Sequence, residues 1–167
     1  MKRKITAAIV IALAVSLALS GCGETVRNFI MGNVDGEIGK TYSTKWFDFI
    51  VSSVDKVDEY SEYTPPEGYT LLDVVVKETN TFDEPITMGT FDFYLTTDTS
   101  SMEIYPLDPF NDDPTLMPEE FDLALKESAE YHMIFEFPAD ATGVTLKYTE
   151  VDEDDNVSAT FSIKLPD

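Results

Sequence analysis

The fold is indicated most clearly by one stretch of the sequence, Tyr69-Thr70-Leu71-Leu72-Asp73-Val74-Val75-Val76-Lys77-Glu78-Thr79. It is rich in β-branched residues and begins with an aromatic one, and both types are enriched in strands. Its apolar centre is continuous, which is typical of a strand that is buried on both faces or lies in the middle of a sheet. We therefore expect a β-sheet built around this segment.

Shorter segments on either side alternate between apolar and polar residues, which is the period of a half-buried strand. In residues 46–57 the apolar positions change parity near Ser52-Ser53, so we expect a bulge there. The other predicted strands are residues 91–97 (with Phe91, Phe93 and Leu95 on one face), 103–105, 131–137, 144–148 and 159–165. Residues 121–127 fit either a strand or a helical turn after Pro118. Together the segments predict an all-β protein, an immunoglobulin-like antiparallel β-sandwich of about seven or more strands.

Two blocks of the sequence resemble a known family. Residues 67–77 are similar to the glycine and long hydrophobic strand of the telokin-like, immunoglobulin-fold DUF4352 family. Residues 133–138 (Met-Ile-Phe-Glu-Phe-Pro), followed by 144–146 (Val-Thr-Leu), resemble that family's later pair of strands. The family commonly has a Pro-Gly turn before this pair, where residues 126–130 here read Lys-Glu-Ser-Ala-Glu. The resemblance covers residues 38–167 and implies a small surface sandwich of mostly Gram-positive bacteria, without established catalytic residues.

The N-terminus has the layout of an export signal. Residues 1–4 carry three cations, and an apolar run of about 15 residues follows, shorter than the roughly 20 that a spanning helix needs. The run ends in Leu19-Ser20-Gly21-Cys22, which resembles the lipobox of bacterial lipoproteins. In that family a diacylglyceryl group is attached to the cysteine, and a signal peptidase cuts just before it. An ordinary signal peptide with an incidental cysteine, or an uncleaved anchor, is the alternative.

These features predict three segments: a lipoprotein signal peptide (1–21), a lipidated N-terminus with a tether (22–37), and the sandwich domain (38–167). Cys22 is the only cysteine, so no disulfide can form within the chain. The membrane is then a partner through the lipid on Cys22. We expect a lipid-anchored protein on the extracytoplasmic face of the cell membrane, in a Gram-positive cell surface.

The charge of the chain is strongly negative. Cleavage after Gly21 would leave 146 residues with 8 Lys and Arg against 32 Asp and Glu, a formal net charge of −24. No basic stripe exists to meet phosphates, which excludes nucleic acid as an expected partner. Eleven Phe, eight Tyr and one Trp argue against disorder. The acidic surface is interpreted as a solvated one, and the alternative is that some carboxylates gather divalent cations.

The sequence offers little for catalysis. Its one histidine, His132, lies in a predicted strand opposite Met133 and Phe135, so it is interpreted as a surface or structural residue. One histidine cannot supply a zinc site, and no phosphate-binding glycine loop is present. We therefore expect no enzyme, with a hydrolase that uses paired carboxylates as a remote alternative.

Two acidic clusters are candidate metal ligands. Asp152 and Asp154 are spaced as in a calcium loop, but Val157 replaces its glycine and the closing glutamate is missing, which favours a hairpin turn. The second cluster, Asp108, Asp112 and Asp113, lies in a proline-rich loop that could hold a weak calcium ion. Apart from this possible calcium, no cofactor is expected.

Four aromatic residues lie in or next to predicted loops, where sandwich proteins often bind partners. They are Tyr60, Tyr63, Tyr105 and Phe110. Each could contact a ligand, or pack its loop over the core. The sequence thus predicts a non-enzymatic binding module for a protein or an envelope glycan, with a calcium-binding or calcium-stabilised domain as the alternative.

Overall fold

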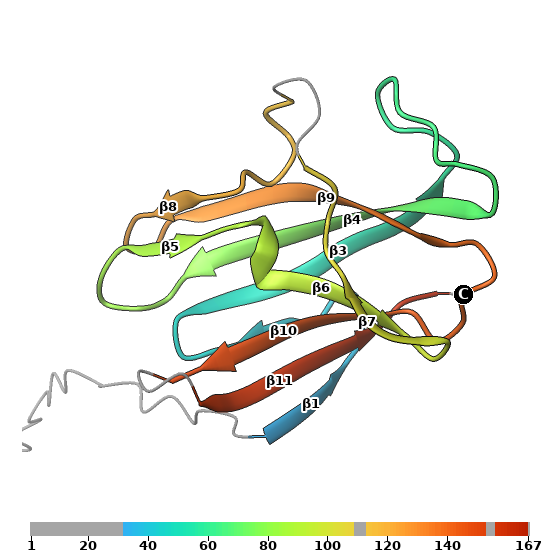
Figure 1. The fold of residues 1–167 in the computed structure, drawn as a ribbon. Helices are drawn as coiled ribbons and strands as arrows, with labels where there is room; N and C mark the ends of the chain where they lie inside the picture. The colour runs from blue at the N-terminus through green and yellow to red at the C-terminus, as the bar shows by residue number, and fades with distance from the viewer. Residues whose placement is uncertain (1–31, 109–112, 153–155, 167) are drawn as a thin grey trace, which may run out of the picture.

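The computed structural model describes residues 32–108, 113–152 and 156–166, which form two facing β-sheets (Figure 1). One sheet has five strands, in the order β1 (Gly32–Gly36), β11 (Val157–Lys164), β10 (Thr145–Val151), β6 (Phe93–Thr97) and β7 (Ser100–Ile104). The other has four, in the order β2 (Thr41–Ser43), β3 (Phe47–Val57), β4 (Tyr69–Asn80) and β9 (Ser128–Pro138). The all-β sandwich predicted from the sequence is confirmed.

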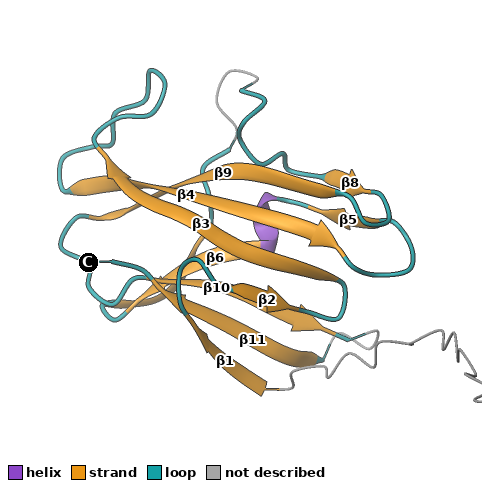
Figure 2. Cartoon of the chain, turned by 180° about the vertical axis from the view of Figure 1, so that it is seen from behind, coloured by secondary structure: helices purple, strands orange, loops and turns teal. Residues whose placement is uncertain are grey.

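A small third sheet closes one end of the sandwich. It pairs β5 (Ile86–Met88) with β8 (Phe121–Leu123), and the single 3-10 turn η1 (Thr90–Asp92) lies next to it, purple in Figure 2. The strand alternative for residues 121–127 is thereby confirmed for three of those residues, and a turn follows them.

Strand β4 lies between β3 and β9 and pairs with both along nearly its whole length. The predicted bulge is confirmed, because the β3–β4 register shifts between Val51 and Ser53. The core-facing residues of β4 from Leu72 onward alternate strictly: Leu72, Val74, Val76, Glu78 and Asn80 are all buried. Its central position explains why this segment carried the strongest signal.

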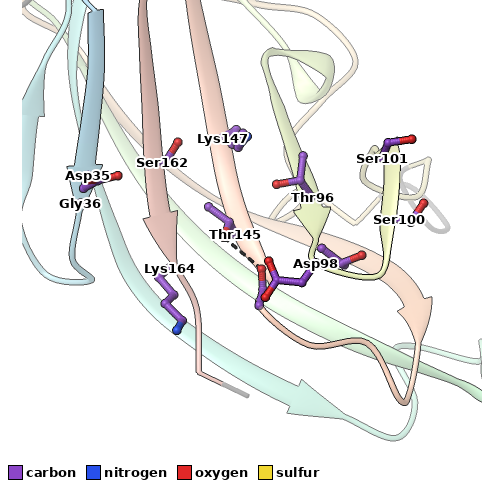
Figure 3. Close-up of a pocket in the computed structure, with 12 residues that line it drawn as sticks. Asp35, Gly36, Thr96, Asp98, Ser100, Ser101, Thr145, Lys147, Ser162 and Lys164 are labelled. Carbon is purple, nitrogen blue, oxygen red and sulfur yellow. Dashed lines mark hydrogen bonds between the residues drawn. The ribbon is translucent and has the colours of Figure 1, made fainter.

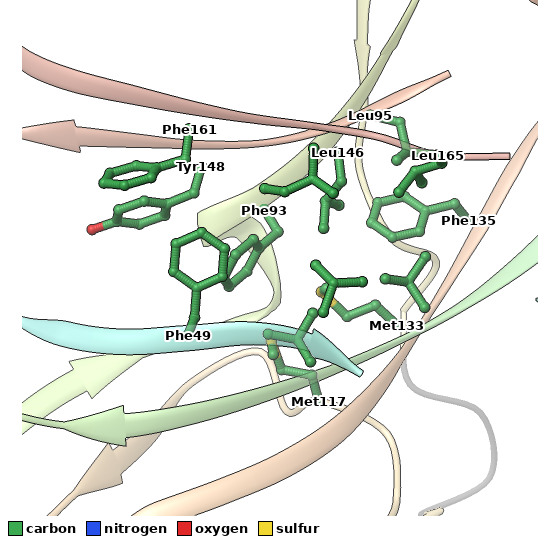
Figure 4. Close-up of a cluster of buried hydrophobic side chains, with 14 of the residues drawn as sticks. Phe49, Phe93, Leu95, Met117, Met133, Phe135, Leu146, Tyr148, Phe161 and Leu165 are labelled. Carbon is green, nitrogen blue, oxygen red and sulfur yellow. The ribbon is translucent and has the colours of Figure 1, made fainter. Parts of the chain in front are cut away.

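Aromatic side chains from both sheets meet in the core (Figure 4). Phe49 of the four-stranded sheet contacts Phe93, Tyr148 and Phe161 of the five-stranded sheet, with ring centroids 5.5 to 5.9 Å apart. Edge-to-face pairs of this kind contribute about 0.5–1.5 kcal/mol each beyond the area they bury. They fix how the two sheets sit on one another.

Two sequence predictions need correction. The sandwich begins before residue 38, because β1 lies within the expected tether and pairs in parallel with β11 from Gly32↔Ala159 to Gly36↔Ile163. Phe91 does not share the core face of Phe93 and Leu95, because η1 turns the chain there and leaves Phe91 54% exposed.

The N-terminal predictions fall on residues that the structure does not describe. These are the signal peptide 1–21, the lipobox residues Leu19, Ser20 and Gly21, and Cys22. Within the described ranges, no helix has the length and apolar character needed to cross a membrane.

Candidate functional site

A polar groove of about 670 Å³ lies on the five-stranded sheet, at the end where β11 finishes (Figure 3). We call it the hydroxyl–lysine groove. Its lining is Asp35, Gly36, Thr96, Thr97, Asp98, Ser100, Ser101, Gly143, Thr145, Lys147, Ser162 and Lys164.

Strand register brings these residues together from five strands, β1, β6, β7, β10 and β11. Thr145 of β10 is paired with Lys164 on one side and with Thr96 on the other. Ser162 of β11 is paired with both Lys147 and Asp35. Residues opposite one another share a face of the sheet. Because Leu146, Tyr148, Phe161 and Ile163 of the same strands face the core, the polar residues between them form one outward ladder.

Most of this ladder is left without partners. Within the described part of the chain, six groove side chains make no side-chain hydrogen bond or ion pair: Asp35, Thr96, Ser101, Lys147, Ser162 and Lys164. Thr145 Oγ1 donates to the Gly143 carbonyl at 3.1 Å, the dashed line in Figure 3. Lys147 and Lys164 are the two cations in the lining of the groove.

The loop at the groove's end depends on a glycine. Gly143 has φ = 65°, in the left-handed region that side chains disfavour. A Cβ at this position would lie 2.1 Å from Asp98 Oδ2, so only glycine lets the Asp98 carboxylate rest over the loop. The Asp98 amide donates to the Thr142 carbonyl at 2.9 Å, which holds the two loops together.

An aromatic patch continues the same sheet face toward its other end. Tyr105 contacts both Phe91 and Tyr94, with ring centroids 5.8 Å apart for Phe91–Tyr105 and 5.9 Å for Tyr94–Tyr105. These three rings line a hollow of about 500 Å³, together with Asp92 and Glu103. Tyr94 is the cross-strand partner of Lys147, so the patch and the groove are contiguous.

The four-stranded sheet carries polar residues on its outer face as well, and some of these are paired with one another. His132 Nδ1 lies 2.9 Å from Asp73 Oδ1. Tyr60 Oη donates to Asp113 Oδ2 at 3.1 Å, and the Asp113 carboxylate also accepts from Thr115 Oγ1 at 2.7 Å. Hydrogen bonds from Thr115 lower the pKa of Asp113.

The predicted ligand residues therefore separate into two groups. Tyr60 and Tyr63 pack with Leu71, Leu116 and Ile134, and Tyr63 also donates to Glu136. Their loop packs as a cover over this second, smaller apolar cluster. Tyr105 instead belongs to the aromatic patch, and Phe110 lies outside the described residues.

Of the predicted metal ligands that the structure describes, Asp108 and Asp113 line the same surface hollow, and Asp152 lies in the β10–β11 turn. Asp108 is exposed, Asp113 is turned toward Tyr60 and Thr115, and Asp112 and Asp154 lie outside the described residues. Asp152 Oδ1 accepts from the Asn156 amide at 2.9 Å across the β10–β11 turn, as a hairpin requires. Among the residues that the structure describes, no three His, Cys, Asp or Glu side chains are arranged to hold a metal ion.

Sequence reasoning missed the groove. The available signal was weak: two of the few lysines occur at outward positions of strands predicted to be consecutive, Lys147 and Lys164. Nothing in the sequence placed Asp35 or Thr96 beside them, because those contacts depend on long-range pairing.

Chemically, the groove suits a ligand rich in hydroxyl groups. Serine and threonine hydroxyls both donate and accept, ammonium groups donate, and carboxylates accept. Each hydroxyl of a sugar also donates and accepts, so it needs both kinds of partner. Exposed aromatic rings beside such a groove offer an apolar surface to the C–H faces of the same ligand.

Comparison with known proteins yields structural likeness only. No protein-family model matches this chain, and no curated protein matches it. The chain resembles the ycdA protein of Bacillus subtilis, described as a candidate lipoprotein, with a TM-score of 0.56 and 19% identity over 74% of this chain. It spans only 38% of the length of that protein.

Two further solved structures are similar over nearly their whole length. The yjhA protein of Bacillus subtilis has a TM-score of 0.57 and 17% identity, covering 78% of this chain and 98% of its own. A β-sandwich protein of Clostridium difficile 630 has a TM-score of 0.51 and 13% identity, covering 80% and 96%. These likenesses support the β-sandwich fold, and membership of the DUF4352 family stays a prediction.

Proposed function

We propose that this protein is an exported lipoprotein, anchored through Cys22, whose sandwich binds an envelope glycan and catalyses no reaction. The observation that carries the proposal is the hydroxyl–lysine groove, in which six polar side chains have no partner within the described residues. Polar groups that could pair with one another but do not are available to a ligand without first breaking bonds.

The composition of the groove favours a glycan over a protein partner. Its lining combines hydroxyls, carboxylates and lysines, with no large apolar side chain, whereas protein interfaces usually have an apolar core. The adjacent aromatic patch extends the surface along the same strands, which suits a chain of several sugar units. The two lysines further favour a glycan that carries carboxylate or phosphate groups.

The proposed location rests on the sequence of the N-terminus. The basic start, the short apolar run and Leu19-Ser20-Gly21-Cys22 support export and lipidation. Two acyl chains on Cys22 would hold the protein to a bilayer stably, where one would be marginal. The likeness to ycdA, a candidate lipoprotein, is in keeping with this location at a Gram-positive cell surface.

Titration of the purified chain with soluble fragments of bacterial wall glycans tests the proposal. Anionic fragments should bind, and Lys147→Ala and Lys164→Ala should each weaken binding by about tenfold. Lys77→Ala is the matched control, because Lys77 is exposed on the other sheet. Equal loss with Lys77→Ala, or no binding of any fragment, would exclude the groove as a glycan site.

The anchor is tested separately. Cys22→Ser should leave the protein unprocessed by the lipoprotein peptidase and without attached lipid. If that variant were still processed and extracted with the membranes, the lipobox interpretation would be wrong.

Calcium binding near Asp108 and Asp113 remains the alternative prediction. A rise of the melting temperature in millimolar calcium, removed by Asp113→Asn, would support it. An unchanged melting temperature would rule it out.

A further inference from the structure

Two glutamates are buried between the sheets, and they differ in their surroundings. Glu150 of β10 is 4% exposed, and its carboxylate accepts from the Lys45 amide at 2.6 Å and from Ser158 Oγ at 2.8 Å. Glu78 of β4 is 0% exposed, and neither of its carboxylate oxygens has a hydrogen-bond partner within the described residues. A buried carboxylate without a partner is costly, so its presence needs an explanation.

Further acidic groups surround the same part of the core. Burial raises the pKa of the Tyr148 hydroxyl, and the charges of Asp92, Glu150 and Glu78 raise it further. Acidic groups from both sheets and from η1 are therefore within electrostatic reach of one tyrosine. The Asp92 carboxylate is held by the Gly89 amide at 2.8 Å.

Tyr148 also forms part of the wall of a pocket of about 270 Å³. The rest of the wall is Trp46, Phe47, Ile86, Thr87 and Met88. Three of the six lining side chains are aromatic, and aromatic rings attract cations to their faces. The chain already shows this contact here, because Lys45 Nζ lies 4.1 Å from the centroid of the Trp46 ring.

We propose that this pocket binds a small organic cation, an ammonium group on a short apolar body, with Glu78 as the nearby counter-charge. The aromatic wall would contact the ammonium group and its methyl or methylene groups. Glu78 is the cross-strand partner of Phe49, and the Phe49 ring lies 5.9 Å from the ring of Tyr148 in the pocket wall, so the carboxylate borders the same aromatic cluster as the pocket. The strongly negative protein would also attract a cation from a distance.

Binding should be coupled to a proton. Burial, with a smaller effect of the Asp92 charge, raises the pKa of Glu78 to about 8. The carboxyl is then protonated near neutral pH when the pocket is empty, and a cation beside it favours the charged form. One proton should leave as the cation binds, so affinity should rise from pH 6 to pH 8, as linkage requires.

Calorimetric titration with choline, and with its neutral isostere 3,3-dimethyl-1-butanol, tests the charge requirement. Choline should bind at least about tenfold more tightly. Its binding heat should depend on the ionisation enthalpy of the buffer, which reports the released proton. Equal affinity for both probes, or no binding of either, would overturn the proposal.

Glu78→Gln tests the role of the carboxylate. The variant should fold, because it replaces an unpaired carboxylate with a neutral group of the same shape. It should bind choline about tenfold more weakly and release no proton. Glu130→Gln is the control, because Glu130 is exposed on the neighbouring strand β9, where its carboxylate accepts from Ser52 Oγ at 3.2 Å. Unchanged choline binding by Glu78→Gln would show that Glu78 is not the counter-charge.

Discussion

The two sheets of the sandwich differ in which of their polar side chains are paired. On its outer face the four-stranded sheet pairs His132 with Asp73 and Tyr60 with Asp113, but on its inner face it leaves Glu78 without a partner. The five-stranded sheet pairs its buried glutamate, Glu150, and leaves the lysines of the hydroxyl–lysine groove unpaired outside.

This difference shows that polarity alone does not mark a site in this molecule. Both outer faces are rich in polar residues, and the sequence pointed to candidate ligand residues beside each of them: Tyr60 and Tyr63 at one, and Tyr105 at the other. Paired groups contribute to the stability of the fold. Buried unpaired groups lower that stability, and exposed unpaired groups are available to bind a ligand. The candidate sites are therefore the places where several unpaired polar groups line one groove, or where an unpaired carboxylate is buried, and the following predictions test that distinction.

The largest effect is expected from Glu78. Its pKa in the folded state is raised to about 8, so the folded protein binds more protons than the unfolded chain between the ordinary carboxyl pKa and pH 8. The free energy of unfolding should be highest at acidic pH and fall by up to about 1.4 kcal/mol per pH unit as pH rises through this window.

Urea unfolding of the parent and of Glu78→Gln at several pH values measures this contribution. The variant should lose that part of the pH dependence and be several kcal/mol more stable than the parent above pH 8. General charge repulsion affects both proteins alike, so only their difference counts. Parallel pH profiles would show that Glu78 is paired or solvated.

Substitution of Glu150 should have the opposite effect on stability, because it should lower the free energy of unfolding. Glu150→Ala removes two hydrogen bonds to a buried carboxylate and leaves the Lys45 amide without its acceptor. A loss of about 2 kcal/mol in the free energy of unfolding is expected near neutral pH. Glu130→Ala, on the exposed outer face, should change it by less than about 0.5 kcal/mol. If Glu150→Ala were as stable as the parent, the hydrogen bonds of Glu150 would not contribute to stability, and the two glutamates would not differ in this respect.

Substitution of Gly143 tests whether the shape of the groove matters for binding. Gly143→Ala and Gly68→Ala both place a side chain at positive φ, which should lower the free energy of unfolding by about 1 kcal/mol in each variant. Only at Gly143 does the new Cβ meet Asp98, since nothing lies within 4 Å of a Cβ at Gly68. Both variants should lose similar stability, but only Gly143→Ala should weaken glycan binding. Binding loss in both would point to a general loosening of the fold.

The smallest effect is expected on the paired outer face. Asp73→Ala breaks a half-exposed pair with His132 and should lower the free energy of unfolding by about 0.2–1 kcal/mol. Neither glycan nor choline binding should change. If Asp73→Ala impaired glycan binding, the four-stranded face would share the function, and the distinction drawn above would fail.

Periodicity predicted the long strands correctly because each buries one face over many residues. It failed for β1, whose sequence Gly32-Asn33-Val34-Asp35-Gly36 has one large apolar residue and becomes a strand only by pairing with β11. Strand β5 was missed for the same reason, since three residues carry almost no period. In these segments tertiary pairing overrides weak local preference.

For the pocket beside Glu78, the sequence held one usable signal. Strict alternation from Leu72 places Glu78 on the core face, so a charged residue at an inward position could have been noticed. The absence of partners around it depends on packing and could not be read from the sequence. The groove was out of reach for a related reason, because its residues come from five strands in three distant parts of the chain.

The parallel pairing of β1 with β11 also has a mechanical consequence. The described chain enters the sheet at Gly32, beside Ala159, while Lys164 of the groove lies at the opposite end of the same strands. A ligand held in the groove and an anchor at Cys22 would pull from opposite ends, so tension would run along the strands. The hydrogen bonds between β1 and β11 would then be loaded in shear and resist together, rather than open one after another.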